Sequence, residues 1–330
     1  MKKIVFCPLS PNMWEGFQTL YEDIISDPDN KVWVIPVPTY RRDSDNNLSD
    51  CEYSLEGYPA NVKITEVNNF SFETEQPDII YVQNISDTET LGFTMHPFFH
   101  TTNLKRFTKN LTYIPYSCMK EPGCSNHEYL ESIRFMLVPS GFYNIDHAIV
   151  QSENMKSTLM HLLAGQSKAL FDEWNSKITW QSYPRIEILK RYNKKTVPHP
   201  KEWDSFLVHK TTIHLLCTSV LDVLENNRNL FVKLKVTMKK YIDIKDQVLL
   251  IWRPHREMMT ILKIMRPELV DEYEEILNYY KSNNIGILDE SVTPTAAITF
   301  ADKYIGDSCA VAVLFKSTGK EMDFTLFGDT

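Results

Sequence analysis

The stretch VLLIWRPHREMM, residues 248–259, decides how the second half of this 330-residue chain is interpreted. Its first five residues are apolar without interruption, which is typical of a strand buried on both faces of a parallel sheet. The apolar run ends abruptly at Arg253-Pro254-His255, where a proline stands between two side chains that can hold an anion. The stretch therefore predicts a buried strand whose carboxyl end carries chemistry.

The same pattern of short apolar runs bounded by polar residues recurs on both sides of this stretch. It predicts strands at residues 3–9, 31–38, 77–84, 111–117, 147–152, 211–219, 246–252, 286–289 and 303–306. Helical periodicity lies between them and predicts helices at residues 13–27, 103–110, 155–165, 220–241, 256–265, 268–283, 294–302 and 308–318. Gly165 is expected to end the helix at 155–165.

Strand–helix alternation that occurs twice along a chain predicts an α/β protein with two facing Rossmann-like domains and a cleft between them. We expect an N-terminal domain at residues 1–165 and a C-terminal domain at residues 209–330. The weakly patterned residues 166–208, rich in Lys, Pro and Trp, are expected to form a crossover between the domains. Residues 41–76 are polar and are expected to be mostly loop with short strands.

Composition limits the class of partner. The hydrophobic content of 43% is enough for substantial cores, and the aromatic content of 12% argues against disorder. A formal net charge of -8 disfavours non-specific binding of nucleic acid, which needs a concentrated positive surface. We therefore expect no nucleic-acid partner, although a local basic pocket for a phosphate is compatible with an acidic protein.

The location of the protein is predicted from its N-terminus and its cysteines. The opening MKKIVFCPLSPNMWEG has too short an apolar run for a signal peptide, and no run approaches the ~18 apolar residues of a membrane span. The six cysteines are scattered without the rhythm of a disulfide framework. We expect a cytoplasmic protein with reduced thiols.

Three strand ends in the second half carry residues suited to an anionic ligand, and open parallel sheets bind ligands at such ends. They are Cys217-Thr218-Ser219, Arg253-Pro254-His255 and Gly306-Asp307-Ser308. Hydroxyls and helix N-terminal amides can cradle a phosphate, and Gly306 would let the backbone approach closely. Each segment also has a plain structural interpretation, because Ser219 and Ser308 can simply cap helices and His255 can be a solvated loop residue.

Metal and nucleotide motifs are incomplete elsewhere. His96 and His100 are four residues apart, but Pro97 lies within the spacing and the glutamate of a zinc-protease motif is missing. Cys118, Cys124 and His127 are loosely spaced, so we expect no bound metal.

Two further segments have plain structural interpretations. Residues 317–320, STGK, resemble the end of a P-loop without its leading glycine or final hydroxyl residue. The basic residues 231–245 are interpreted as a helix with a solvated lysine face rather than a membrane contact.

Taken in order along the chain, several of these segments resemble the CDP-glycerol glycerophosphotransferase family of teichoic-acid-type enzymes, and a short clostridial-like subgroup in particular. The segments are PDIIYVQN, MHPFFHTTNLKRFTKNLTYIPYS, HAIVQSENM, CTSV, LLIWRPH, YIGDSCAV and STGK. The resemblance implies the GT-B fold, two facing Rossmann-like domains with the nucleotide donor held in the C-terminal one. It also implies a transferase that moves glycerophosphate from CDP-glycerol to a hydroxyl acceptor in the synthesis of a cell-surface polymer or glycan.

The resemblance assigns roles to particular residues. His255 is implied in transfer and His100 as the base for the acceptor hydroxyl, with His96 as the alternative, since histidine accepts a proton near neutrality. Donor phosphates are implied to contact Arg253, Thr218, Ser219, Gly306, Asp307 and Ser308. The implied reaction needs no metal or other cofactor. A membrane-linked acceptor would bring the enzyme to the inner face of the cell membrane.

The chain departs from the family pattern at four places: Gln83-Asn84-Ile85-Ser86, Arg256, Cys309-Ala310 and Glu321. The C-terminal domain is also expected to be shortened beyond Lys320, where such folds continue through a strand and a helix. Alternatives therefore stay open: a glycosyltransferase that uses a nucleotide sugar, or a non-catalytic GT-B-like binding or partner protein. A metal-dependent hydrolase built on His96 and His100 is a third.

Overall fold

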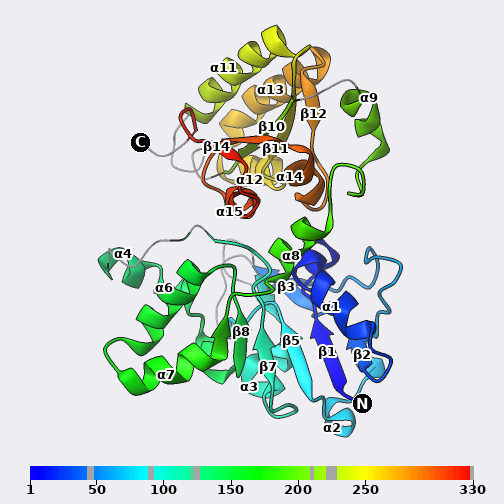
Figure 1. The fold of residues 1–330 in the computed structure, drawn as a ribbon, viewed down its shortest axis with the longest axis vertical. Helices are drawn as coiled ribbons and strands as arrows, with labels where there is room; N and C mark the ends of the chain where they lie inside the picture. The colour runs from blue at the N-terminus through cyan, green and yellow to red at the C-terminus, as the bar shows by residue number, and fades with distance from the viewer. Residues whose placement is uncertain are drawn as a thin grey trace. The chain divides into compact units, whose positions relative to one another are not determined.

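The computed structural model describes residues 1–42, 48–87, 93–119, 121, 127–208, 212–220 and 229–327. The chain forms two compact units, the first from residues 1–117 and 121–188 and the second from residues 118–120 and 189–330. Both are α/β units with a central parallel sheet, as the alternation predicted (Figure 1).

The main sheet of the first unit has six parallel strands in the order β2-β1-β5-β7-β8-β9. They are β1 (Lys3–Cys7), β2 (Lys31–Val34), β5 (Ile79–Val82), β7 (Leu111–Tyr113), β8 (His147–Ile149) and β9 (Ile178–Thr179). The order reverses between β1 and β5, so their carboxyl ends form the topological switch point of this sheet.

A small antiparallel sheet joins β4 (Leu48–Glu52), β3 (Thr39–Arg42) and β6 (Phe93–Met95). Short strands were expected within residues 41–76, but their pairing with β6 was not. The helices of the first unit are α1 (Gln18–Ile25), α2 (Phe72–Glu75), α3 (Thr101–Leu104), α4 (His127–Ser132), α5 (Arg134–Leu137), α6 (Glu153–Ala164), α7 (Lys168–Lys177) and α8 (Pro184–Arg191). Short 3-10 helices lie at Pro11–Gly16, Val67–Asn69, Pro97–Phe99 and Ser140–Asn144. Gly165 ends α6 in a positive-φ conformation, as expected.

The expected crossover at residues 166–208 is more structured than its weak pattern suggested. Helix α7 and strand β9 complete the first unit, because β9 pairs with β8 as the edge strand of the main sheet. The division between the units falls within α8, after Ile188. A strand of two residues is too short to give a periodic signal, which is why the pattern did not indicate β9.

The second unit has five parallel strands in the order β12-β11-β10-β13-β14. They are β10 (Thr212–Thr218), β11 (Val248–Pro254), β12 (Gly286–Leu288), β13 (Lys303–Gly306) and β14 (Glu321–Asp323). In chain order this is 3-2-1-4-5, a doubly wound Rossmann arrangement. Strand β14 was not expected, and it forms directly beyond Lys320, where we predicted a shortened domain.

The helices of the second unit are α9 (Asp204–Leu207), α11 (Asn229–Ile244), α12 (Met258–Met265), α13 (Val270–Ser282), α14 (Thr295–Phe300) and α15 (Ala310–Lys316), with 3-10 helices at Lys201–Trp203 and Pro267–Leu269. Residues 221–228, predicted as the start of a helix, lie outside the described part of the chain. Among the described residues, no helix combines the length and the apolar character needed to cross a membrane.

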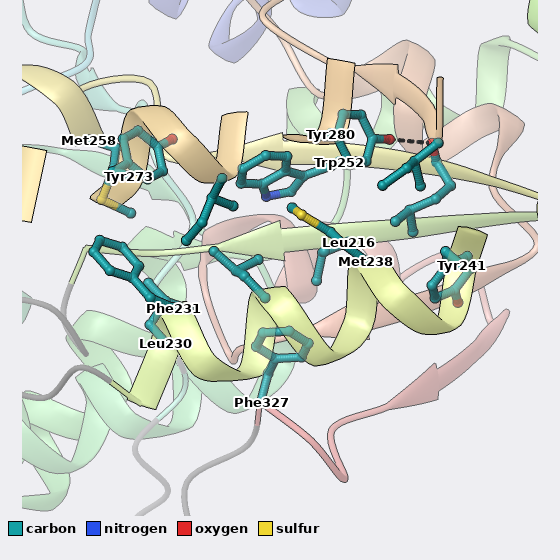
Figure 2. Packing of buried hydrophobic residues seen from close by; sticks show 14 of the residues in the cluster. Leu216, Leu230, Phe231, Met238, Tyr241, Trp252, Met258, Tyr273, Tyr280 and Phe327 are labelled. Carbon is teal, nitrogen blue, oxygen red and sulfur yellow. Dashed lines mark hydrogen bonds between the residues drawn. The ribbon is translucent and has the colours of Figure 1, made fainter. Parts of the chain in front are cut away.

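The core of the second unit fixes the strand with which the sequence analysis began. Trp252 is fully buried, and its ring packs edge-on against Tyr280 at 5.3 Å between ring centroids. Figure 2 shows this cluster, in which Phe231 and Met238 of α11 meet Leu216 of β10 and the aromatic residues of α13. Helix α11 therefore buries its apolar stripe and leaves lysines such as Lys239 and Lys240 exposed, as its pattern predicted.

Candidate functional site

The parallel register of the second sheet brings the three predicted strand ends together. Cys217 lies opposite Arg253 on one side and opposite Gly306 on the other. The strand order reverses between β10 and β13, so these residues sit at the topological switch point, where doubly wound sheets bind ligands. We call the residues at this edge, Thr218, Ser219, Arg253, His255 and Gly306 to Cys309, the strand-end cluster.

Gly306 makes the close approach of β13 and β10 possible. Its φ angle is +147°, and a Cβ atom at this position would lie 2.3 Å from the backbone oxygen of Cys217. A side chain there would force the two strands apart, so only glycine fits this conformation and spacing. The prediction that Gly306 permits close backbone contact thus has a local cause, whether or not a ligand also uses the space.

Arg253 is held by a buried carboxylate that the sequence analysis did not single out. Its Nη1 donates to Oδ2 of Asp289 at 2.7 Å and to Oγ of Ser291 at 3.2 Å. The Arg253 side chain is 12% exposed and the Asp289 side chain 0% exposed. Asp289 follows β12 directly, at a fourth strand end. A polar residue in this position, as at the three predicted strand ends, was the signal that could have found it.

A cavity of about 370 Å³ lies along β12 in the second unit, and Ser291, which accepts from Arg253, is one of its lining residues. Its walls include Trp203, Phe206, Leu288, Glu290 and Ser291. The volume lies within the range of small-molecule sites, which combine apolar walls with a few polar groups. The cavity therefore follows β12 and reaches the strand-end cluster only through Ser291, the partner of Arg253.

His255 is exposed, and the backbone fixes its ring. Its N–H donates to the carbonyl of Thr218 at 2.9 Å, and its Nδ1 accepts from the backbone N–H of Glu257 at 3.2 Å. Because Nδ1 is the acceptor, the neutral ring carries its proton on Nε2. Desolvation lowers the pKa of His255, and the nearby Arg253 charge lowers it further, against the opposing effect of Glu257 and Asp307. Neutral His255 is therefore a hydrogen-bond donor at Nε2.

Thr218 and Ser219 make contacts that hold the site together. Thr218 is buried, and its hydroxyl oxygen lies 3.4 Å from the indole Nε1 of Trp252, which donates to it. The N–H of Ser219 donates to Oδ2 of Asp307. That amide is therefore occupied by a carboxylate rather than being open to a phosphate.

Asp307 has one oxygen whose role nothing in the described residues accounts for. The residue is 9% exposed, and its Oδ1 is buried without a hydrogen-bond partner in the described part of the chain. The backbone around it is fixed, since the N–H of Asp307 donates to Cys217 and its carbonyl accepts from the Tyr304 hydroxyl at 2.6 Å. A buried polar atom without a partner calls for an explanation, and a hydroxyl or amine of a ligand is one.

Ser308 does not cap the helix that follows it. Helix α15 begins at Ala310 with Cys309 as the N-cap residue, and no side chain among the described residues donates or accepts at that cap. With seven residues, α15 offers little helix dipole for an anion. The expected capping role of Ser308 is therefore wrong.

In the first unit, the two candidate histidines have different surroundings. Nδ1 of His96 accepts from the N–H of Phe98 at 3.2 Å and so caps the 3-10 helix Pro97–Phe99. His100 is the N-cap residue of α3, and its Nε2 is buried without a partner among the described residues. His96 and His100 therefore flank a 3-10 turn instead of sharing one face of an α-helix.

A carboxylate beside His100 closes the start of α3. Asp87 is buried, and it accepts from the N–H of Thr101 at 2.7 Å, from the Thr101 hydroxyl at 2.6 Å and from the N–H of Thr102 at 3.1 Å. The side chain of Asn144 also donates to the Thr101 hydroxyl at 2.9 Å. This network fixes the backbone that carries His100.

The STGK segment has a structural explanation, and the metal motifs are incomplete in the described residues. Nζ of Lys320 donates to the carbonyls of Ile298, Thr299 and Ala301 at 2.7–3.0 Å, so it caps the carboxyl end of α14. The described residues contain no group of three or more His, Cys, Asp or Glu side chains that could hold a metal ion. Cys124 lies outside the described residues.

No protein-family model matches the chain, and no curated protein matches its sequence. Solved structures do resemble it. The S. aureus MnaA–UDP structure is 12% identical, with a TM-score of 0.54, over 94% of this chain and 75% of MnaA. The Methanocaldococcus jannaschii UDP-GlcNAc 2-epimerase in complex with UDP-GlcNAc and UDP is 15% identical, with a TM-score of 0.51, over 95% of this chain and 82% of that one.

A structure of the wall teichoic acid polymerase TagF is 12% identical to the chain, with a TM-score of 0.50, over 97% of this chain and 69% of that one. At such low identity these likenesses establish the fold and nothing finer. With the two parallel sheets and their strand orders, they show that the chain has the pair of Rossmann-like units of the GT-B fold.

Proposed function

We propose that the chain is a transferase that moves glycerophosphate from CDP-glycerol to a hydroxyl acceptor, without a metal, in the synthesis of a cell-surface polymer or glycan. The observation that carries the proposal is the strand-end cluster, which joins an exposed histidine, a buried arginine–carboxylate pair and a buried oxygen without a partner at the switch point of the second sheet. The resemblance of LLIWRPH and its companion segments to the glycerophosphotransferase family supports the choice of donor.

Donor binding would use polar groups that still have free hydrogen-bonding capacity. Nε2–H of His255 can donate to a phosphate oxygen, and Arg253 keeps guanidinium nitrogens beyond the one that bonds Asp289 and Ser291. Oδ1 of Asp307 would accept from a hydroxyl of the donor, because a carboxylate repels phosphate. The adjoining cavity with Trp203 and Phe206 offers space for the nucleoside.

The proposed reaction is an attack by the acceptor hydroxyl oxygen on the glycerol-linked phosphorus. The bond from that phosphorus to the oxygen of CMP breaks, and the hydroxyl proton passes to a base. Phosphoryl transfer depends mainly on positioning and on charge stabilisation, which Arg253 and His255 would supply as CMP leaves.

His100 is our candidate for the base. Its Nε2 lacks a partner among the described residues, so its lone pair is not already engaged. Neutral His96 carries its proton on Nε2, since Nδ1 accepts from Phe98. The lone pair of His96 is therefore in use, which makes it the weaker choice.

A second candidate function is transfer from a nucleotide sugar. The likeness to proteins whose structures contain UDP or UDP-GlcNAc favours it, as does an Asp307 oxygen able to accept from a sugar hydroxyl. A non-catalytic protein that binds nucleotide is the third outcome to be separated from the other two.

The deciding experiment compares donors and then turnover. We expect CDP-glycerol to raise the melting midpoint more than UDP-GlcNAc, equally with and without EDTA. A ligand at ~100 times its dissociation constant adds about 2.7 kcal/mol, and each kcal/mol shifts the midpoint by roughly 2–4 °C in a chain of this size. Release of CMP from CDP-glycerol in the presence of a polyol-phosphate acceptor would then establish transfer.

Each other outcome assigns a different function. A larger shift with UDP-GlcNAc, with UDP release, would favour the nucleotide-sugar reaction. Stabilisation by nucleotide without release of CMP or UDP would favour the non-catalytic protein. If no nucleotide shifts the midpoint, the proposed function is wrong.

A further inference from the structure

Two thiols meet inside the strand-end cluster. Cys217, the last but one residue of β10, is 2% exposed, and Cys309 is the partly buried N-cap residue of α15. Both are free cysteines, and the side chain of each shifts the pKa of the other. Cys217 pairs with Gly306 in the sheet, and its backbone oxygen accepts from the N–H of Asp307 at 3.3 Å, so the turn that leads to Cys309 lies on the end of β10. The hydroxyl of Tyr304 lies 3.4 Å from the sulfur of Cys309. The fold therefore brings together two sulfurs that are 92 positions apart in the sequence (309 minus 217).

The two thiols differ in their ability to ionise. Burial raises the pKa of Cys217 well above its ordinary value, so Cys217 keeps its proton. The neighbouring Cys217 side chain is the main cause that lowers the pKa of Cys309, and its effect outweighs that of burial. Since the thiolate is the reactive form of cysteine, Cys309 is the nucleophile of the pair and Cys217 the neighbour that can resolve it.

We propose that Cys309 and Cys217 form an oxidation site that reacts with hydroperoxides and closes into a disulfide. The Cys309 thiolate attacks one oxygen of hydrogen peroxide, the O–O bond breaks, and hydroxide leaves to become water on taking up a proton. Cys309 is then a sulfenic acid. The sulfur of Cys217 attacks that of Cys309, the S–O bond breaks, and a second water leaves with the Cys217 proton. Two thiols and one peroxide thus give one disulfide and two waters.

The disulfide would act on the backbone that carries Asp307 and Ser308. These residues lie between Gly306, paired with Cys217 in the sheet, and Cys309. Bringing the two sulfurs to covalent distance must draw the start of α15 toward the end of β10. Asp307, which bonds both Ser219 and Cys217, lies inside the loop that is pulled. The consequence for nucleotide binding rests on the proposed function, whereas the formation of the disulfide does not.

The first test is chemical and needs no nucleotide. The full-length reduced protein is treated with equimolar hydrogen peroxide, remaining thiols are alkylated, and the digest is analysed by mass spectrometry. We expect a cross-linked peptide that joins Cys217 to Cys309, lighter by two hydrogens than the reduced pair and absent after treatment with dithiothreitol.

Three variants sharpen this test. Cys309→Ser and Cys217→Ser should each abolish the cross-link, and in Cys217→Ser a sulfenic acid at Cys309 should persist long enough for trapping with dimedone. Cys51→Ser, at an exposed cysteine of the first unit, should leave the cross-link intact. Because Cys217 is buried, Cys217→Ser can disturb folding, whereas Cys309→Ser changes a partly exposed residue and is the safer variant. A different cysteine pair, or no reaction at Cys309, would overturn the proposal.

The second test asks what the disulfide does. The dissociation constant of CDP-glycerol is measured by calorimetry for the reduced and oxidised protein, and oxidation should raise it by about tenfold or more. Cys309→Ser should show no change on peroxide treatment. An equal constant in both states would overturn the effect on the site. If the cross-link forms but neither state binds a nucleotide, the proposed function fails while the oxidation site stands.

Discussion

The carboxyl edges of the two parallel sheets share one architecture but treat their polar groups differently. At the first edge, the buried amide of Gln83 accepts from the N–H of Leu9 at 3.2 Å and donates to the carbonyl of Met13 at 2.8 Å. These two bonds connect the segments that follow β5 and β1, the strands on either side of the switch point. Asp87 at the same edge accepts three hydrogen bonds. At the second edge, Oδ1 of Asp307 has no partner among the described residues, and His255 is exposed.

The unpaired oxygen and the exposed histidine distinguish the second edge as the one suited to a donor ligand. Buried polar groups that satisfy one another hold a backbone in place, whereas a buried group left unpaired is retained for another purpose. We interpret the first edge as a scaffold that positions His100, whose Nε2 is itself buried without a partner among the described residues, and the second as a binding edge. Substitutions at each edge test this contrast.

The largest expected effect comes from the ion pair at the binding edge. Arg253→Met leaves the fully buried Asp289 carboxylate without its cation and should lower the free energy of unfolding by about 3–5 kcal/mol. Urea denaturation monitored by tryptophan fluorescence measures the loss. Arg256→Met, three positions away and exposed, is the matched control and should change stability by less than about 0.5 kcal/mol. Equal effects for the two arginines would show that the pair is not structurally important.

His255→Ala should have the next largest effect, and on turnover rather than on folding. Loss of a positioned proton donor lowers rates by about 10²–10⁴-fold. The exposed ring should leave the melting midpoint almost unchanged. CMP release from CDP-glycerol measures turnover, with His96→Ala as the comparison from the scaffold edge. If His96→Ala stops turnover and His255→Ala does not, the roles of the two edges are exchanged.

Asp87→Ala tests the scaffold edge. It removes a carboxylate that accepts three hydrogen bonds at the start of α3, and we expect a loss of about 2–4 kcal/mol from the free energy of unfolding, since bonds to charged groups contribute more than neutral ones. Chemical denaturation measures it, with the exposed Glu73→Ala as control. A stable Asp87→Ala protein that has lost turnover would mean that Asp87 acts in the reaction.

The smallest effect concerns a histidine away from both edges. Nδ1 of His199 lies 2.9 Å from the carbonyl of Val197 and its Nε2 lies 2.9 Å from Asp204, so only the protonated ring can donate to both. Burial lowers the pKa of His199, but these two partners outweigh it and the net direction is upward.

A raised folded-state pKa fixes the sign of the pH effect. The contribution of His199 to stability is fully present below its unfolded value of ~6.5 and is lost as the pH rises through the higher folded value. His199→Gln should therefore reduce stability at acidic pH by less than about 1 kcal/mol, since Asp204 is exposed, and should have less effect at alkaline pH. Denaturation curves on both sides of neutrality measure the difference, and a larger effect at alkaline pH would refute the assignment.

Much of the fold was predictable because long apolar runs end sharply. The strand at 303–306 was predicted with its observed bounds, and the run at 246–252 differs from β11 by two residues at each end. Strands β9 and β14 were missed because two or three residues with mixed polarity give no period. The antiparallel sheet was anticipated only as short strands within residues 41–76, because its pairing with β6 joins residues far apart in the sequence.

For the candidate site, only the residues that directly follow the strands were predictable from the sequence. Parallel register had to bring Cys217, Arg253 and Gly306 to one edge, so their proximity followed from the fold class. Hydrogen-bond partners did not follow. The sequence could not show that Asp289 would hold Arg253 or that Asp307 would occupy the amide of Ser219, because these contacts depend on side-chain directions in loops. The expected cap at Ser308 failed for the same reason.

The reactivity of Lys320, which donates to three carbonyls, can report on the opening of one helix end in the second unit. Its ammonium group is held at the end of α14, and burial lowers the pKa of Lys320. An acylating reagent can reach that nitrogen only after it leaves the carbonyls, whereas exposed lysines such as Lys239 react at once. The rate at which Lys320 is acylated would therefore measure how often the carboxyl end of α14 opens locally while the rest of the protein stays folded.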